Sequence, residues 1–285
     1  MIENQIKIGI MNGRLSKPID NQIQSFPVNS WKSEFEKAQK CGFDTIEWVF
    51  DLYPNPILHD EGIQEIKYLS EKYDIKVNTV CADYFMNRMI FNVSEYDLEQ
   101  NISMLKQLIQ QCSKLGIEIL EIPFVDSSSL RSENDKITLI ENLKKILDFS
   151  HSQNVKITLE TDLPPNDFRN LLEKFNDLNI GANYDTGNSA ALGYDVKEEL
   201  QALMPWLTNI HIKDRLYHSD TVPLGTGHTN FDLFFSTLAK INYKGQLIIQ
   251  GAREDNMFEP EDTCKKYLIF VNNFVSKYSI IDSAN

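Results

Sequence analysis

One pattern recurs along this chain and limits the folds open to it. An amphipathic stretch leads to a turn containing Gly, Asn or Asp, and four to six β-branched or apolar residues follow. Eight strands are expected in this way, at residues 7–11, 45–48, 75–80, 117–122, 155–160, 180–185 and near Asn209 and Leu247. Strands that alternate with helical patterns indicate parallel β/α units. Eight units favour an α/β fold of the closed (β/α)8 barrel type, a TIM barrel, over an open sheet.

The segments between the strands carry apolar stripes at helical spacing. The two clearest stripes are Leu98, Ile102, Leu105, Leu108 and Ile109, and then Leu139, Leu143, Ile146 and Leu147. We expect both to be core-facing sides of helices.

The connections that follow strands are longer than those that precede them. The longest are residues 12–29, 50–61, 83–94 and 214–230. In a β/α barrel the post-strand loops build the active-site face, so we expect the functional residues there.

The whole chain, residues 1–285, is expected to form a single barrel domain. Its 285 residues, 42% hydrophobic and 24% charged, suit one full core, and no Pro/Gly/Ser-rich linker divides the sequence. Barrels of about 250 residues are routinely single domains.

A cytoplasmic location without a membrane partner is the default expectation. The N-terminus lacks the basic region, apolar stretch and cleavage site of a signal peptide, and no run approaches the roughly 18 apolar residues that span a bilayer. The four cysteines, Cys41, Cys81, Cys112 and Cys264, show neither metal nor redox spacing, which fits a reducing compartment.

The net charge of −13 argues against a nucleic-acid partner. Duplex binding depends on Lys and Arg that neutralise phosphates. A small anionic substrate stays open, because exposed charges beyond about 8 Å are largely screened at physiological salt.

The last four expected strands each end near a side chain that binds metals or protons. These side chains are Glu160, Asp185, His211 and Gln250. Closing the barrel would bring all four to one mouth. Two carboxylates, one imidazole and one amide oxygen suit one divalent ion, Mn²⁺ or Mg²⁺ before Co²⁺ or Zn²⁺.

Each of these residues also has a structural explanation. A strand-end acid is more often a turn former or helix cap, and a satisfied interior histidine is common. The joint placement at successive strand ends is therefore what indicates a site. The Gly225-Thr226-Gly227 turn leaves two readings open, a phosphate cradle or a simple chain reversal.

Three runs carry a resemblance to a known family. They are Tyr184-Asp185-Thr186-Gly187-Asn188, then His211-Ile212-Lys213-Asp214, then Val222-Pro223-Leu224-Gly225-Thr226-Gly227 with Phe231-Asp232. In this order they resemble the sugar phosphate isomerase/epimerase superfamily with the xylose isomerase-like barrel. Within it, the spacing is most similar to the L-ribulose-5-phosphate 3-epimerase and hexulose-6-phosphate isomerase group.

The resemblance implies a metal-dependent sugar isomerase or epimerase. Glu160, Asp185, His211 and an acid from the eighth strand would bind one divalent metal, and Asn188 and Lys213 would hold the substrate. In such enzymes a carboxylate removes a proton beside a metal-polarised carbonyl, giving an enediolate, so Glu160 is the expected catalytic base. Members of this group often pair, so a homodimer is one expectation.

Gln250 departs from the family pattern, which has a second catalytic Glu there. An amide oxygen can bind metal but cannot carry a proton. One base with a more electrophilic metal suits proton transfer between adjacent carbons, which tilts the expectation from epimerase towards isomerase. Glu254 or Asp162 could replace the missing acid.

Free and phosphorylated sugars both stay open as substrates. Lys213, Arg215 and Arg253 are cations near the barrel mouth that could meet a phosphate, and each could equally serve a surface ion pair. We therefore include Arg253 among the candidate substrate-binding residues.

Three other functions are alternatives to a sugar isomerase or epimerase. Abasic-site endonucleases share the barrel but need several zinc ions, and His59, His151, His218 and His228 show no shared strand-end pattern. A keto-polyol dehydratase or lyase would use the same metal and base. A catalytically silent sugar-binding barrel would explain the loss of the second acid at Gln250.

Overall fold

The eight predicted strands form the closed parallel barrel that the sequence indicates. The computed structural model describes residues 6–20, 22–254 and 259–280. Each strand pairs in parallel with the next one along the chain, and the first pairs with the last to close the barrel. The strands are β1 (Ile8–Met11), β2 (Thr45–Val49), β3 (Lys76–Cys81), β4 (Ile119–Phe124), β5 (Lys156–Thr161), β6 (Ile180–Asp185), β7 (Leu207–Ile212) and β8 (Gln246–Ile249).

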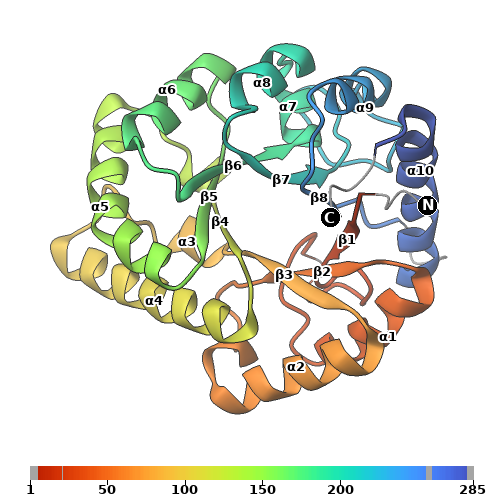
Figure 1. Cartoon of the computed structure of the whole chain (residues 1–285), viewed down its shortest axis with the longest axis horizontal. Helices are drawn as coiled ribbons and strands as arrows, with labels where there is room; N and C mark the ends of the chain where they lie inside the picture. Colours follow the sequence, from red (N-terminus) through yellow and green to blue (C-terminus); the bar gives the residue numbers. More distant parts are fainter. Residues whose placement is uncertain (1–5, 21, 255–258, 281–285) are drawn as a thin grey trace.

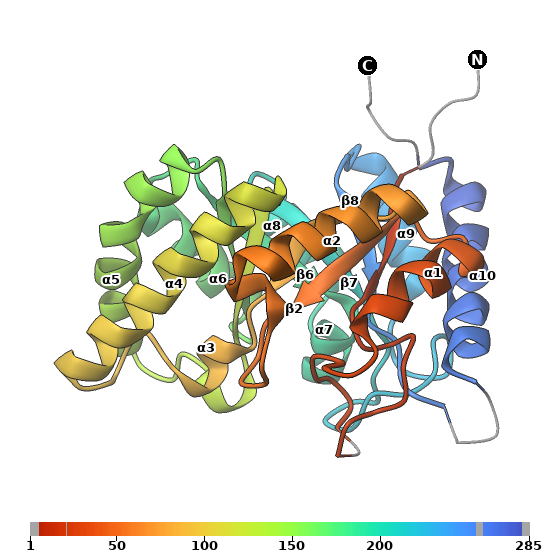
Figure 2. The ribbon, with the colours of Figure 1, turned by 90° about the horizontal axis from the view of Figure 1, so that it is seen from below.

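Helices form a ring around the barrel (Figure 1). They are α1 (Trp31–Cys41), α2 (Asp60–Tyr73), α3 (Tyr84–Asn87), α4 (Glu95–Leu115), α5 (Glu133–Ser152), α6 (Pro165–Phe175), α7 (Thr186–Leu192), α8 (Val196–Leu203), α9 (Phe231–Lys240) and α10 (Pro260–Tyr278), with 3-10 turns at Pro56–Leu58 and Asp126–Ser128. The short helices α3 and α7 lie among the post-strand loops at the lower face in Figure 2. That face carries the candidate site.

Local sequence sets where several helices begin and end. Gly42 and Gly116 take left-handed conformations, with φ of 93° and 73°, directly after α1 and α4. Glycine adopts this region without steric cost, so each helix stops there. Ser132 begins α5 through a capping box with Asp135. The two glycines are thus part of the turns that separate helix from strand in the sequence pattern.

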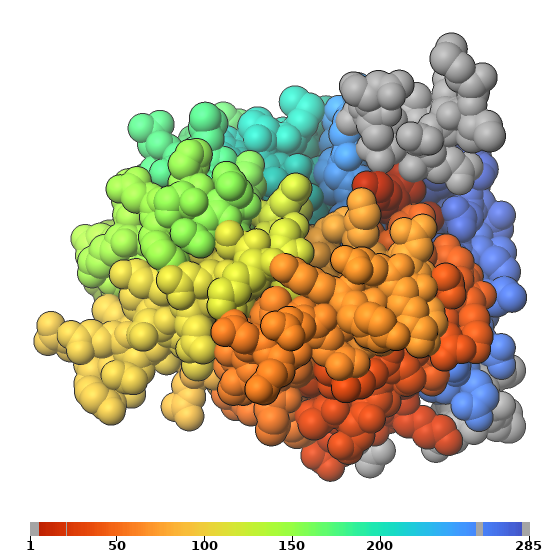
Figure 3. Space-filling model, turned by 60° about the horizontal axis from the view of Figure 1, so that its bottom comes forward, coloured from red at the N-terminus to blue at the C-terminus, as the bar shows by residue number. Residues whose placement is uncertain are grey.

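The predicted helical stripes face the core. Leu105, Leu108 and Ile109 of α4 are fully buried, and so are Leu139 and Leu143 of α5. The helices α2 and α4 lie side by side along one flank of the molecule (Figure 3). Together the helices cover the barrel wall, so that the strands are buried on both faces.

Two strand boundaries differ from the sequence expectation in a way that matters for the site. The strand expected at residues 117–122 is β4, two residues further on, which places Glu121 in its interior. The last strand ends at Ile249, so Gln250 follows the strand instead of ending it. Its backbone N–H still donates to the Ile212 carbonyl at 2.9 Å, which fixes Gln250 beside β7.

Within the described segments, no helix is long and apolar enough to cross a membrane. The prediction of one domain over residues 1–285 stays a prediction, although the described residues contribute all eight strands of one barrel.

Candidate active site and metal centre

Neighbouring strands place the predicted metal ligands close to one another. Glu160 lies on β5, Asp185 is the last residue of β6 and His211 lies on β7, directly paired with Asp185 in the strand register. All three side chains are buried. Their ligand atoms lie within 4.8 Å of one another. The sequence patterns at three strand ends therefore converge on one cluster.

The Nδ1 atom of His211 faces the two carboxylates. It lies 3.3 Å from Glu160 Oε2 and 4.0 Å from Asp185 Oδ2. Asp185 uses its other oxygen, Oδ1, to accept from the backbone N–H groups of Gly187 and Asn188 at the start of α7. Its Oδ2 is buried without a hydrogen-bond partner. A buried oxygen of this kind is available to a cation, so the donor set fits a divalent metal.

Gln250 also presents a free oxygen. Its amide nitrogen donates to Gln24 Oε1 at 2.6 Å, whereas its own Oε1 is buried without a hydrogen-bond partner. The free atom is thus the one that could bind a metal or a substrate hydroxyl. The role of Gln250 as a fourth metal ligand stays a prediction.

Two further carboxylates, which the sequence patterns did not single out, hold the opposite side of His211. Its Nε2 lies 2.7 Å from Glu47 Oε2 and 3.0 Å from Glu121 Oε2. Glu47 also accepts from Asn209 at 2.8 Å. Both acids are fully buried, on β2 and β4. Donation from Nε2–H to a carboxylate leaves Nδ1 as the metal-binding atom and makes it more basic.

The charges inside this cluster shift the pKa values strongly. Burial acts to lower the pKa of His211, but the charges of Glu121 and Glu47 outweigh burial and raise it well above its usual value. Burial acts to raise the pKa of Glu160, but its hydrogen bond to His211 and the charge of the ring bring it to about 2. Burial raises the pKa of Glu121 well above normal. Without metal, the ring is therefore an imidazolium held by carboxylates.

A second trio, Glu47, Glu121 and His211, also has ligand atoms within 4.8 Å of one another. Each trio has one member on the wall of the neighbouring cavity, Glu121 in the second trio and Glu160 in the first. Glu47 Oε2 closes off Nε2 at the hydrogen-bond distance of 2.7 Å, whereas the carboxylates that face Nδ1 lie 3.3 and 4.0 Å from it and leave more room for an ion. The side of His211 that faces Glu160 and Asp185 therefore fits a metal better.

A cavity of about 560 Å³ opens above Glu160. Post-strand residues 22–24, 51–53 and 125–127 form much of its wall, as the loop lengths predict. Asn188, Lys213 and Gln250 also line it. A cavity of this size accommodates a small sugar.

Asn188 and Lys213 lie beside the carboxylates. Asn188 Nδ2 donates to Glu160 Oε1 at 2.7 Å, and Lys213 Nζ lies 3.6 Å from Asp185 Oδ2. Asn183 donates to the other oxygen of Glu160, also at 2.7 Å. Glu160 is thus fixed by two amides. The substrate contacts predicted for Asn188 and Lys213 stay predictions.

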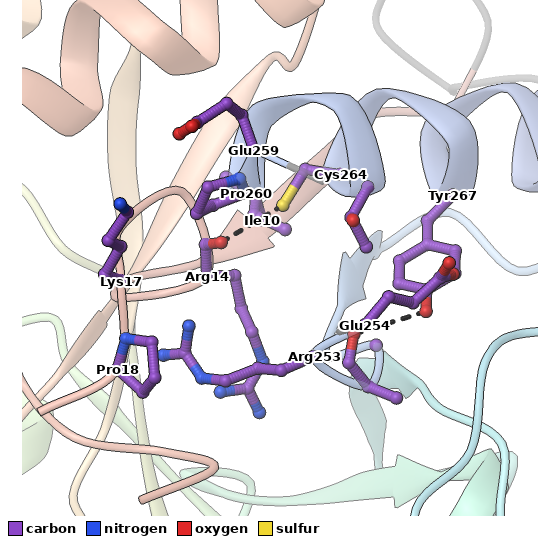
Figure 4. Close-up of a pocket in the computed structure, with 13 residues that line it drawn as sticks. Ile10, Arg14, Lys17, Pro18, Arg253, Glu254, Glu259, Pro260, Cys264 and Tyr267 are labelled. Atoms are coloured by element: carbon purple, nitrogen blue, oxygen red, sulfur yellow. Dashed lines mark hydrogen bonds between the residues drawn. The ribbon is translucent and has the colours of Figure 1, made fainter. Parts of the chain in front are cut away.

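Arg253 lies in the wall of a different cavity, of about 310 Å³, between the loop after β1 and the start of α10. Figure 4 shows its side chain extending towards Arg14 and the loop that carries Lys17 and Pro18. Its guanidinium donates to the backbone carbonyls of residues 13, 16 and 23. These bonds fix the loop. Substrate binding by Arg253 stays a prediction and would require it to exchange them.

The other candidates from the sequence lie elsewhere. Glu254 pairs with Lys266 at 2.9 Å, and Asp162 accepts from Ser129, and neither lines the cavity that contains Glu160. In the glycine turn, the backbone N–H groups of Gly225 and Gly227 both donate to Asp214 Oδ2. Because these amides are already paired, they are not free to cradle a phosphate.

Comparison with known proteins places the chain in a family. The inosose isomerase of Bacillus licheniformis is 24% identical, with 90% of this chain and 97% of that protein covered. The putative L-ribulose-5-phosphate 3-epimerase SgbU of Haemophilus influenzae is 23% identical, with 88% and 90% covered. The solved structure of the IolI protein with a binding zinc atom has a TM-score of 0.78 at 19% identity and covers 96% of this chain and 99% of that one. Residues 35–268 match the family described as xylose isomerase-like TIM barrel. The chain therefore belongs to the xylose isomerase-like TIM barrel family.

Proposed function

We propose that this chain is a divalent-metal-dependent enzyme that isomerises or epimerises a sugar by moving a proton beside its carbonyl group. The names of two relatives belong to this class. The observation that carries the proposal is the cluster of Glu160, Asp185 and His211, with Glu160 on the cavity wall. It combines a base and a cation-binding donor set in one place.

A metal bound by these residues would polarise the substrate carbonyl and make the neighbouring C–H more acidic. Two carboxylates, one imidazole and the Gln250 amide oxygen favour Mn²⁺ or Mg²⁺, with Co²⁺ and Zn²⁺ as alternatives. The related IolI structure is described with zinc. Metal analysis of the protein after purification in the presence of all four ions would identify the preferred one.

Glu160 is the proposed base. Its Oε2 faces the Nδ1 atom of His211, so Oε2 is the oxygen on the metal side. Its Oε1 accepts from Asn188, which lines the cavity, so this oxygen is on the substrate side. A pKa of about 2 keeps the group ionised at neutral pH. A carboxylate base depends on the polarised carbonyl to acidify the carbon.

Gln250 favours isomerisation within this class. An epimerase returns a proton to the opposite face of the same carbon and needs a second acid for it, whereas one base can move a proton between neighbouring carbons on one face. Gln250 has no ionisable proton. The same residue supports the alternative of a silent sugar-binding barrel.

The test is NMR of ketoses and ketose phosphates incubated in D₂O with the Mn²⁺-loaded protein. We expect deuterium at C1 or C2, which marks an isomerase. Deuterium at C3 would mark an epimerase with another second acid. Glu160→Gln is the control, because it keeps the side-chain shape and removes the base, and its Mn²⁺ content is measured alongside because Glu160 is also a proposed metal ligand. Exchange that persists in this variant contradicts the assignment, and a wild-type protein without exchange on any sugar refutes the function.

We also propose that the enzyme acts in the cytoplasm and binds no nucleic acid. The net charge of −13 supports the second statement. A homodimer is the expected assembly, and light scattering at several concentrations tests it.

A further inference from the structure

The cavity that contains Glu160 is strongly acidic. Its charged lining consists of five carboxylates and one ammonium group: Asp51, Asp83, Glu121, Asp126 and Glu160 against Lys213. Asp185 adds a sixth carboxylate, 3.6 Å from Lys213. A divalent metal supplies two positive charges, so the charged groups around the cavity still sum to a negative value once metal is bound. Burial raises the pKa of Asp83 to about 6, and even with Asp83 and Glu121 protonated no positive excess arises.

Among the described residues, Lys213 is the cation of the lining, and it already has anionic and polar partners. Lys213 Nζ is 3.6 Å from Asp185 Oδ2 and 3.4 Å from Asn188 Oδ1, and its side chain is only 15% exposed. Its charge is therefore largely compensated by a neighbouring carboxylate. A phosphate dianion would have to draw it away from that carboxylate.

The arginines nearest the cavity do not line it. Arg14 donates to the Ile23 carbonyl and to Gln24 Oε1. Arg215 donates to Asn188 and to the Ser219 carbonyl, and Arg253 donates to three backbone carbonyls of the loop after β1. Arg88 and Arg131, at the post-strand face, are exposed and do not line the cavity. The segments outside the described residues contain neither Lys nor Arg.

Carboxylates in such a wall select ligands that donate hydrogen bonds. An ionised carboxylate only accepts, and the hydroxyl groups of a sugar donate to it at short range. A phosphate dianion brings further acceptors and two negative charges, so it meets repulsion instead of hydrogen bonds. Inside a partly buried cavity this repulsion is screened far less than at the surface.

We propose that the substrate of this chain is an uncharged ketose or keto-polyol and not a sugar phosphate. The carboxylates of the cavity wall accept from its hydroxyl groups, while the metal site takes its carbonyl end. This assignment rests on the proposed isomerase or epimerase function and names its substrate class. The names of the relatives include both a sugar phosphate epimerase and an inosose isomerase, so they do not decide between the two classes.

Matched pairs of sugars test the proposal. D-ribulose, L-ribulose, D-xylulose and D-fructose are each compared with their phosphates, using the Mn²⁺-loaded protein and deuterium exchange to obtain kcat/KM. Within each pair that reacts, we expect the kcat/KM of the free ketose to exceed that of its phosphate by about tenfold or more, as repulsion between like charges in a cavity predicts. A phosphorylated member that reacts as well as or better than its free partner overturns the proposal.

Calorimetric binding of the same pairs to the Glu160→Gln protein, at a Mn²⁺ concentration at which metal analysis shows one ion per chain, separates the two hypotheses. If no sugar exchanges deuterium, the proposed function fails, while tighter binding of the free members still supports an uncharged ligand. Tighter binding of the phosphorylated members overturns the present proposal alone. A protein that binds neither member of any pair overturns both.

A charge variant gives a second, independent readout. Asp126 is exposed, lines the cavity and has a φ of 51°, a conformation that Asn also tolerates. Asp126→Asn should raise the affinity of phosphorylated relative to free ketoses about two- to fivefold by removing one repulsive charge. Glu71→Gln, an exposed change on α2 away from the cavity, is the matched control and should leave this ratio unchanged. Equal ratios in both variants contradict the electrostatic argument.

Discussion

Glu199 is a buried carboxyl group on α8 that should make the stability of this protein depend on pH near neutrality. Its side chain is 7% exposed. Its Oε2 accepts from the Tyr184 hydroxyl at 3.2 Å and from the Ser189 hydroxyl. Burial outweighs these hydrogen bonds and raises its pKa to about 7. Ser189 and Tyr184 lie on α7 and β6, which meet at the proposed metal ligand Asp185.

The sign and the size of the effect follow from the two pKa values. The pKa of about 7 means that the folded protein holds the Glu199 proton up to about pH 7, whereas the unfolded chain loses it near the ordinary value of 4.5. Between these values the folded state binds more protons, so stability falls as pH rises through this window. The difference of about 2.5 units corresponds to about 3 kcal/mol, lost in full above pH 7.

Urea unfolding of wild type and Glu199→Gln at pH 5 and pH 8.5 measures this loss. The variant cannot ionise and keeps an oxygen that accepts from Ser189. We expect it to gain about 3 kcal/mol on the wild type between the two pH values. Glu198→Gln, an exposed neighbour on the same helix, controls for the loss of a charge. Other titrating groups cancel in the comparison. Parallel changes in wild type and Glu199→Gln would refute the reasoning.

Four substitutions address the site itself. Glu160→Gln should abolish turnover while thermal unfolding by circular dichroism still shows a folded barrel, and residual turnover within about tenfold of wild type would exclude Glu160 as the base. His211→Ala should remove most metal binding and Glu47→Gln should weaken it about 10- to 100-fold, because Glu47 orients the ring; calorimetric titration with Mn²⁺ measures both, and wild-type affinity in either variant contradicts the assigned role. Gln250→Glu should create or raise C3 exchange in D₂O if the missing second acid is what limits epimerisation, and unchanged exchange would mean that other residues have diverged as well.

The fold could be predicted because its signals are local. The glycine at position 116 ends one helix by its backbone conformation, and the apolar run after it forms β4 whatever its distant partners are. Repeating such a unit eight times leaves few arrangements other than a closed barrel. The same logic placed Glu160, Asp185 and His211, because parallel strands all end at one mouth.

The other half of the site depends on contacts that no local pattern reports. Glu47 and Glu121 lie in the interiors of β2 and β4, where a single acid in an apolar strand looks like a solvent-facing residue. They meet His211 only across the closed barrel, and Glu47 and His211 are 164 positions apart in the chain. The partners of Arg253 were equally hidden, because its donors are taken by carbonyls of the loop after β1.

His211 couples the protonation state of the buried cluster to the proposed metal binding. In the metal-free protein its proton offsets the buried charges of Glu47 on one side and of Glu160 on the other. A metal at Nδ1 needs the neutral ring, so binding displaces one proton and replaces its charge. The apparent metal affinity should then rise about tenfold per pH unit for as long as the metal-free ring stays protonated. Because proton and metal exchange for one another, the buried carboxylates keep a compensating cation in either state, and the barrel can load its metal after folding.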